Sequence, residues 1–155
     1  MLTIDPMLAT PIPVVHDAIA NLQRLTELFQ TRRAALATEA GLTEQQWEVL
    51  ERIATEHFMP SMFARRRDSS AAAVSRLIRQ LLDKRLVSAS AREHDGRQRQ
   101  YVLTAKGRRT LEALRTSRQE AIDAIWATLD HRALETFTRV SGELIRRIEG
   151  YTAAS

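Results

Sequence analysis

The segment spanning residues 69–107 constrains the fold of this 155-residue chain most, because the pattern of its apolar residues changes within it. Its first part has the spacing of an amphipathic helix, with an apolar face made by Val74, Leu77, Ile78, Leu81 and Leu82. Its second part predicts two strands, residues 86–92 and 98–104. They are joined through His94, Asp95 and Gly96, and Asp-Gly favours the positive φ angles of a tight hairpin turn.

The same region holds the positive charge of the chain. Residues 65–109 contain thirteen Lys or Arg and four Asp or Glu, a net charge of +9, whereas the rest of the chain has a net charge of −5. A basic helix face is often only a solvated surface. Here it coincides with a predicted helix and hairpin, so the charge distribution favours a polyanionic partner.

Helical spacing dominates the chain before this region. The first thirteen residues contain three of the four prolines and predict an extended arm, after which Pro13 starts a long first helix. Thr43 stands three residues before Gln46, the spacing of a capping box, and predicts the start of a second helix. Pro60 begins a short third helix that runs through Arg67. Three N-cap residues then precede the basic helix: Asp68, Ser69 and Ser70.

Two further helices are predicted after the hairpin. A fifth helix extends to Leu129 and carries apolar residues at helical spacing, and Asp130 caps a sixth whose inward face holds Leu134, Phe137, Leu144, Ile145 and Ile148. The first, fifth and sixth helices have more apolar surface than a three-helix core with one hairpin can cover. They therefore predict pairing with a second copy of the chain. Trp47 and Trp126 are both expected in the core.

Four short motifs resemble the MarR family of transcriptional regulators. Residues 42–50 match the pattern L-T-x-x-Q-W-x-V-L, and residues 74–77 resemble the family's recognition-helix segment. Residues 95–97 resemble its D-x-R wing, and residues 103–107 match the L-T-x-x-G that leads from the wing into the dimerisation helix. Each motif alone is weak, whereas four in the right order and spacing are a specific signal.

The resemblance implies a mainly α fold with a small β-hairpin, namely a winged helix-turn-helix with long N- and C-terminal dimerisation helices. Residues 1–40 would form the arm and first dimerisation helix, 41–104 the winged helix-turn-helix and 105–150 the C-terminal dimerisation helices, all in one compact unit. The chain departs from the family at Arg67, Asp68 and Ser69, where an apolar residue, a glycine and another apolar residue are usual. It departs again at Arg85, where glycine is common; a side chain in a left-handed cap costs about 1 kcal/mol.

The resemblance and the dimensions of the B-DNA major groove predict a DNA interface. The start of the basic helix should approach base edges, with the cations one turn later on phosphates or a guanine edge: Ser70, Ala71, Ala72, Ser75, Arg76 and Arg79. In the wing, Arg97 is predicted to enter the minor groove, positioned by a salt bridge with Asp95. Contacts to the DNA backbone are expected from Arg92 and Arg99, and Arg67 is a candidate for a further phosphate contact.

These observations predict a dimeric, sequence-specific DNA-binding transcriptional regulator that recognises a pseudo-palindromic operator in double-stranded DNA. The resemblance implies that such a protein is commonly a repressor, released by a small aromatic or anionic effector in a crevice near His16 and the first and fifth helices. The sequence identifies no particular ligand. The alternative is a helical protein-interaction module whose cationic hairpin binds an acidic protein partner.

Other functional classes find little support in the sequence. The four histidines lack the H-x-x-x-H and H-E-x-x-H spacings of metal sites, and there is no G-x-S-x-G elbow or glycine-rich phosphate loop, so neither an enzyme nor a cofactor is expected. The absence of cysteine excludes disulfides and thiolate metal ligands. No apolar stretch approaches the roughly 20 residues of a membrane span, so we expect a soluble cytoplasmic protein with no membrane partner.

Overall fold

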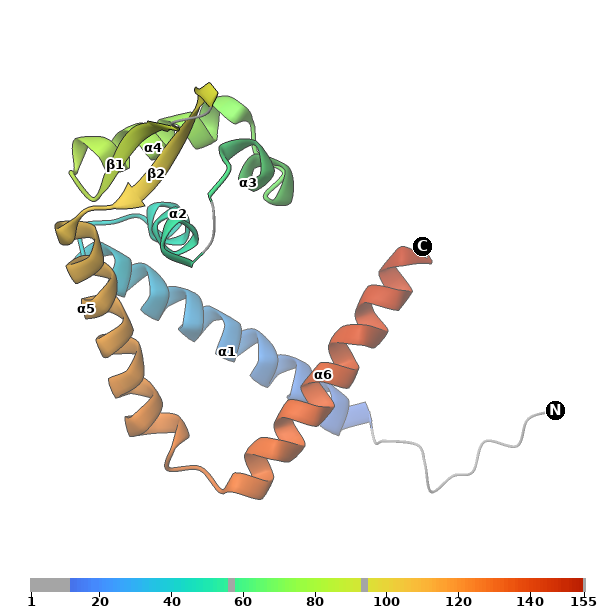
Figure 1. Ribbon diagram of the computed structural model, residues 1–155. Helices are drawn as coiled ribbons and strands as arrows, with labels where there is room; N and C mark the ends of the chain where they lie inside the picture. The colour runs from blue at the N-terminus through green and yellow to red at the C-terminus, as the bar shows by residue number, and fades with distance from the viewer. Residues whose placement is uncertain (1–11, 56–57, 93–94, 155) are drawn as a thin grey trace. The chain divides into compact units, whose positions relative to one another are not determined.

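The computed structural model of the protein describes residues 12–55, 58–92 and 95–154. The elements follow in the order α1 (Ile12–Glu39), α2 (Glu44–Thr55), α3 (Pro60–Arg66), α4 (Ala71–Asp83), β1 (Val87–Arg92), β2 (Asp95–Leu103), α5 (Ala105–Ala121), the π-helix η1 (Ile122–Trp126) and α6 (His131–Ala153) (Figure 1). The predicted fold class, mainly helical with one β-hairpin, is confirmed. The predicted N-terminal arm lies almost wholly outside the described residues.

The chain divides into two units, Met1–Leu114 and Arg115–Ser155. The expected packing of the whole chain into one compact unit stays a prediction. Every buried side chain of the described residues lies in the first unit, and none lies beyond Leu114. The predicted three-part division into arm, winged region and C-terminal helices stays a prediction.

The connection between α1 and α2 combines a left-handed helix end with a capping box. Gly41 has a φ of +70°, and the Leu42 amide donates to the Ala37 carbonyl at 2.8 Å, which closes the end of α1. The Gln46 amide then donates to Thr43 Oγ1, while the Thr43 amide donates to Gln46 Oε1, both at 3.1 Å. The predicted capping box is therefore confirmed.

The helices α3 and α4 end in the same left-handed geometry without glycine. Asp68 has a φ of 49° and Arg85 a φ of 58°. After each of them, the next amide closes the turn on a carbonyl five residues earlier, at 2.9 Å from Ser69 and 3.0 Å from Leu86. The left-handed cap predicted at Arg85 is confirmed, and the unusual turn at Asp68 keeps the helix end that glycine would give.

The basic helix α4 begins where the sequence places it. Of the three candidate caps, Ser70 is the N-cap, because its hydroxyl accepts from the Ala73 amide at 3.1 Å. The predicted apolar face is confirmed: Val74, Ile78 and Leu81 are buried, with Leu77 and Leu82 packed against the core.

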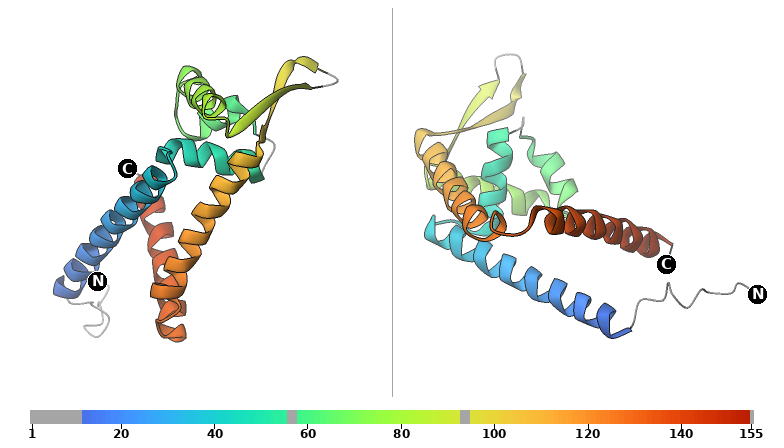
Figure 2. Two further views of the ribbon diagram at one scale, coloured as in Figure 1. Left: turned by 90° about the vertical axis from the view of Figure 1, so that its left-hand side faces the viewer. Right: turned by 90° about the horizontal axis from the view of Figure 1, so that it is seen from below.

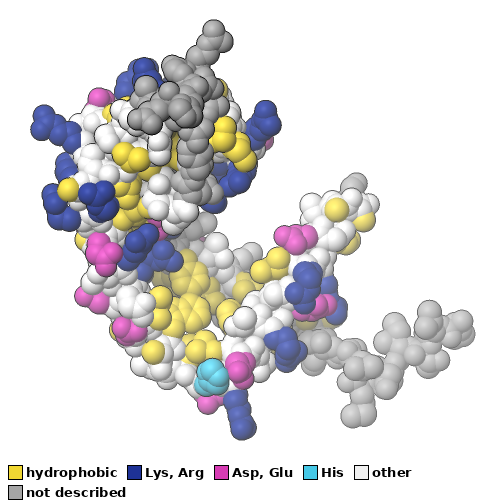
Figure 3. Space-filling view, in the orientation of Figure 1, with side chains coloured by type: hydrophobic (Ala, Val, Ile, Leu, Met, Phe, Trp, Pro, Cys, Tyr) yellow, Lys and Arg dark blue, Asp and Glu magenta, His cyan; other side chains and the backbone are white. Residues whose placement is uncertain are grey.

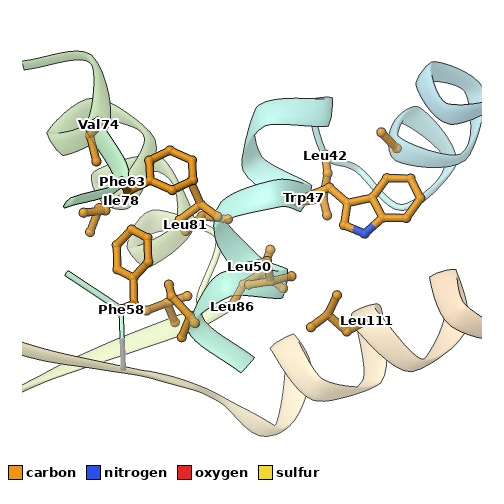
Figure 4. Packing of buried hydrophobic residues seen from close by; sticks show 14 of the residues in the cluster. Leu42, Trp47, Leu50, Phe58, Phe63, Val74, Ile78, Leu81, Leu86 and Leu111 are labelled. Carbon is orange, nitrogen blue, oxygen red and sulfur yellow. The ribbon is translucent and has the colours of Figure 1, made fainter. Parts of the chain in front are cut away.

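The core of the first unit lies among α2, α3, α4, the base of the hairpin and the start of α5 (Figure 4). Its largest fully buried residues are Trp47, Leu50, Leu81, Leu111, Val49 and Val74. Trp47 is a core residue, as predicted, and its indole Nε1 donates to Glu51 Oε1 at 2.9 Å. Trp126, also expected in the core, lies in η1 in the second unit and is only partly buried.

The hairpin extends away from α2, α3 and α4 (Figure 2). The strands β1 and β2 are antiparallel, with Val87 opposite Leu103 and Arg92 opposite Asp95. The prediction that Asp95 and Gly96 form the turn is wrong, because both residues lie in β2, which begins at Asp95; residues 93–94 lie outside the described residues. A register shift between Ala91 and Arg92 accompanies this change.

The base of the hairpin is fastened to the start of α5. Thr104 donates its amide to the Leu86 carbonyl at 3.0 Å and its hydroxyl to the Arg85 carbonyl at 2.7 Å. The same hydroxyl accepts from the Gly107 amide at 3.0 Å. A Cβ atom on Gly107 would lie 2.1 Å from the Leu86 carbonyl oxygen, so only glycine permits this approach.

The second unit contains the end of α5, η1 and α6. The predicted cap of α6 is confirmed, since Asp130 Oδ2 accepts from the Ala133 amide at 2.9 Å. The fifth helix is not continuous to Leu129 as predicted, because η1 follows α5 at Ile122. The face of α6 predicted to point inward is largely exposed in the single chain, including Phe137, Leu144, Ile145 and Ile148. No helix among the described residues is long and apolar enough to cross a membrane.

Candidate nucleic-acid interface

The outer face of α4 presents small and cationic side chains to solvent. Every residue that the sequence analysis assigned to the major groove is exposed and lies at the start or on the outer face of this helix: Ser70, Ala71, Ala72, Ser75, Arg76 and Arg79. The structure thus places these residues together, and the buried face of α4 fixes which way they point. Small side chains at the start of the helix allow a close approach, and the arginines follow one and two turns later.

The positive side chains gather on the part of the first unit that contains α3, α4 and the hairpin (Figure 3). In the wing, Arg99 is exposed on β2. The side chains of Arg92, Asp95 and Arg97 lie outside the described residues, and the predicted ion pair between Asp95 and Arg97 stays a prediction. The hairpin backbone places all four residues in the two paired strands.

Arg67 has a partner inside the protein. Its Nη2 atom lies 3.1 Å from Oε2 of Glu48, an α2 residue whose side chain is mostly buried. The pair links the unusual turn between α3 and α4 to α2. The phosphate contact considered for Arg67 stays a prediction, and the structure gives this cation a second, positioning role that the sequence analysis did not foresee.

A hollow of about 270 Å³ lies beside α4, between the start of α2, α3 and α4. Polar groups of α2 and α4 line it, including Thr43, Gln45, Arg76 and Gln80, while Phe63 and Leu77 contribute apolar surface. The hollow adjoins the exposed face of α4 because Arg76 belongs to both.

A buried amide connects the two helices at this hollow. Gln46 is only 4% exposed, and its Nε2 atom donates to Oε1 of Gln80 at 2.8 Å. The Lys84 ammonium donates to Gln46 Oε1 at 2.8 Å and also to the Gly41 carbonyl. The local capping role of Gln46 was predicted from the sequence. Its contacts with Gln80 and Lys84 were not, because these residues lie 34 and 38 positions away in the chain and give no local signal.

Among residues 12–55, 58–92 and 95–154, no group of three or more His, Asp or Glu side chains could hold a metal ion. His16, which the sequence analysis placed near an effector crevice, is exposed on α1. That crevice stays a prediction.

The sequence of this region matches a known family. Residues 40–98 match the MarR family, and these residues contain α2, α3, α4, β1 and the start of β2. No curated protein sequence matches the chain at a significant level.

The fold is that of solved MarR-family structures. YusO from Bacillus subtilis has a TM-score of 0.74 at 19% identity, with 89% of this chain and 99% of that chain covered. Staphylococcus aureus MarR in complex with salicylate and kanamycin has a TM-score of 0.71 at 15% identity, covering 90% and 95%. The S. aureus MepR–DNA complex has a TM-score of 0.62 at 15% identity, covering 82% and 93%.

Proposed function

We propose that the protein is a dimeric, sequence-specific DNA-binding transcriptional regulator, and the proposal starts from the match of residues 40–98 to the MarR family. The observation that carries the proposal is the outer face of α4. It combines the N-cap Ser70, small side chains in the first turn and the exposed Arg76 and Arg79, next to a hairpin rich in arginine. The S. aureus MepR–DNA complex has the same fold, which supports the same use of this surface.

In the proposed complex, α4 enters the major groove. Ser75 hydrogen-bonds to base edges, the methyl groups of Ala71 and Ala72 contact thymine methyl groups, and Arg76 and Arg79 bind phosphates or a guanine edge. Arg97 of the wing reaches the adjacent minor groove. Base contacts supply the sequence preference, and the arginines supply most of the affinity.

Dimerisation supplies the second half of the interface. The face of α6 that carries Phe137, Leu144 and Ile148 is exposed in the single chain, and a second copy of the chain would cover it. Two copies of α4 would then meet half-sites about one helical turn apart on a pseudo-palindromic operator.

We further propose that the protein represses its target genes and that a small aromatic or anionic molecule releases it. The S. aureus MarR structure of the same fold contains salicylate, an aromatic anion. Such a ligand would act by preferring a spacing of the two α4 helices that does not fit the operator.

Selection from a pool of random duplexes tests the DNA-binding function. We expect the full-length protein to enrich a pseudo-palindromic sequence and to bind it with a steep negative slope of log affinity against log salt concentration. Arg79→Ala should weaken binding and reduce that slope by about 0.9 if the residue contacts a phosphate. Arg139→Ala, which removes an exposed arginine of α6, is the matched control. A pool that shows no enrichment would instead favour an acidic protein as the partner of the cationic hairpin.

A further inference from the structure

The buried amide of Gln46 has a defined orientation. Two groups that can only donate, the backbone N–H of Thr43 and the ammonium of Lys84, lie 3.1 and 2.8 Å from its Oε1 atom. An amide turned the other way would place its NH₂ group against both donors. The oxygen of Gln46 therefore faces Thr43 and Lys84, and its NH₂ group faces Gln80.

This orientation also fixes the exposed amide of Gln80. Its Oε1 atom accepts from Gln46 Nε2 at 2.8 Å, so the oxygen is directed inward, toward α2. The NH₂ group is left to face the hollow that Gln80 lines together with Arg76 and Gln45. Gln80 therefore presents a hydrogen-bond donor rather than an acceptor at this surface.

The position of Gln80 matches the edge of the major groove. A helix in this groove has a phosphate backbone on each side, and the hollow that Gln80 lines lies between α4, α3 and the start of α2. Phosphate oxygens only accept hydrogen bonds, and the hollow adjoins the arginine-rich face of α4. A donor held at this position suits a phosphate oxygen; base edges in the groove also carry acceptors, so the experiment must separate the two.

We propose that Gln80 donates an amide N–H to a DNA phosphate at the edge of the major groove, and that Gln46 is the positioning residue that holds it in this orientation. The proposal rests on the proposed DNA-binding function and adds two residues to its interface. Gln80 is not among the residues that the sequence analysis assigned to DNA, because its position on α4 alone does not distinguish a contact from a solvated side chain.

Gln80→Glu tests the contact. A carboxylate at this position still accepts from Gln46, so we expect unchanged thermal unfolding, but it cannot donate to a phosphate and repels it. Binding to the selected duplex should weaken at least about tenfold. Gln30→Glu, on the exposed surface of α1, makes the same charge change away from α4 and is the control. Gln80→Lys should bind more tightly, with a salt slope steeper by about 0.9.

Gln46→Glu tests the positioning role. A carboxylate accepts from Thr43 and Lys84 as the amide does, but it cannot donate to Gln80. We expect weaker DNA binding without loss of stability, and in a Gln80→Ala background only the smaller loss that the added negative charge causes by itself. A double-mutant cycle on the dissociation constant measures this coupling, and a purely structural role of Gln46 would leave the two changes additive.

The outcomes separate this inference from the proposed function. If the wild-type protein selects no duplex, the proposed function fails and takes this inference with it. If the wild-type protein binds, and Gln80→Glu binds as tightly as Gln30→Glu, the phosphate contact at Gln80 is wrong while the proposed function stands. A changed sequence preference without a uniform loss of affinity would also overturn the phosphate assignment, because it would place Gln80 on a base.

Discussion

At the scale of single residues, three helix ends in the first unit share one backbone geometry but use three different residues. Gly41 is suited to its positive φ, Asp68 tolerates it because its short polar side chain can bond locally, and Arg85 has neither advantage. The geometry is therefore imposed at Arg85 by the surrounding hydrogen bonds, which join Leu86 and Thr104 to the same turn.

Arg85→Gly should stabilise the protein. Glycine removes the strain of a side chain at a φ of 58°, a gain of about 0.5–1 kcal/mol after the added flexibility of the unfolded chain is counted. Urea unfolding followed by circular dichroism measures the change. Arg85→Ala is the control, because it removes the same charge and keeps a side chain at this φ. Equal stability of the two variants would show that the backbone is not strained.

Gly107→Ala should destabilise the first unit. The new Cβ would lie 2.1 Å from the backbone oxygen of Leu86, which cannot move without disturbing the base of the hairpin. Overpacking of this kind costs about 1–3 kcal/mol. Thermal unfolding checks the prediction against Gly150→Ala in α6, where an added Cβ meets no atom within 4 Å. A Gly107→Ala variant as stable as the wild type would contradict the close approach of α5 to the hairpin.

At the scale of elements, α6 contains ion pairs between side chains of the same helix. Oε1 of Glu143 accepts from Arg147 Nε at 2.6 Å, and its Oε2 accepts from Arg146 Nη2 at 2.8 Å. Both pairs lie along one exposed side of the helix, at spacings of three and four residues. These pairs support the helix locally.

The ion pairs of Glu143 predict a pH response within α6. The guanidinium of Arg147, followed by that of Arg146, holds the pKa of Glu143 below its usual value. Because the folded pKa is lowered, the stabilising effect is present above the unfolded pKa and disappears as the pH falls through the folded one. Arg147→Ala should raise the pKa of Glu143, measured by carboxyl NMR titration. Arg132→Ala is the control, and an unchanged pKa in the Arg147 variant would argue against the pair.

The elements also show what the sequence could predict. Local signals were sufficient for the capping box at Thr43, the N-cap at Ser70 and the cap of α6 at Asp130, because both partners lie within three residues. The turn of the hairpin was misplaced because strand register depends on pairing, which moves Asp95 into β2. The break of the fifth helix at η1 could not be predicted, because no proline or glycine marks it in the sequence.

The same distinction applies to the candidate site. The exposed residues of α4 followed from its apolar period, which fixes one face and so defines the other. The contacts of Arg67 with Glu48 and of Gln46 with Gln80 could not be predicted, because each joins side chains on different helices. Tertiary packing alone determines such pairs.

At the scale of the whole molecule, the two units differ in how they bury apolar surface. The first unit has a core centred on Trp47 and Leu50, whereas no residue of α6 is buried. Exposed apolar residues nevertheless recur along α6, including Phe137, Ile145 and Ile148. A second copy of the chain is the partner that our proposal gives to this face.

Ile145→Glu should weaken the proposed dimer. A carboxylate on the apolar face of α6 would lose its hydration on association, so the monomer should dominate at micromolar concentration. Operator affinity should also fall at least about tenfold, because a monomer contacts only one half-site at a time. Sedimentation velocity at several concentrations measures the first effect. Thr136→Glu, on the opposite side of α6, is the control. A variant that sediments as a wild-type dimer would place the interface elsewhere.

The exposure of α6 in the single chain has a consequence for the lifetime of the protein in a cell. A helix that buries none of its residues opens readily, and segments that open readily are those that proteases cleave. In the proposed dimer, association covers this helix, so newly made chains without a partner would be degraded faster than paired ones. The rate of turnover would then depend on the concentration of the protein itself, and scarce copies would be cleared first.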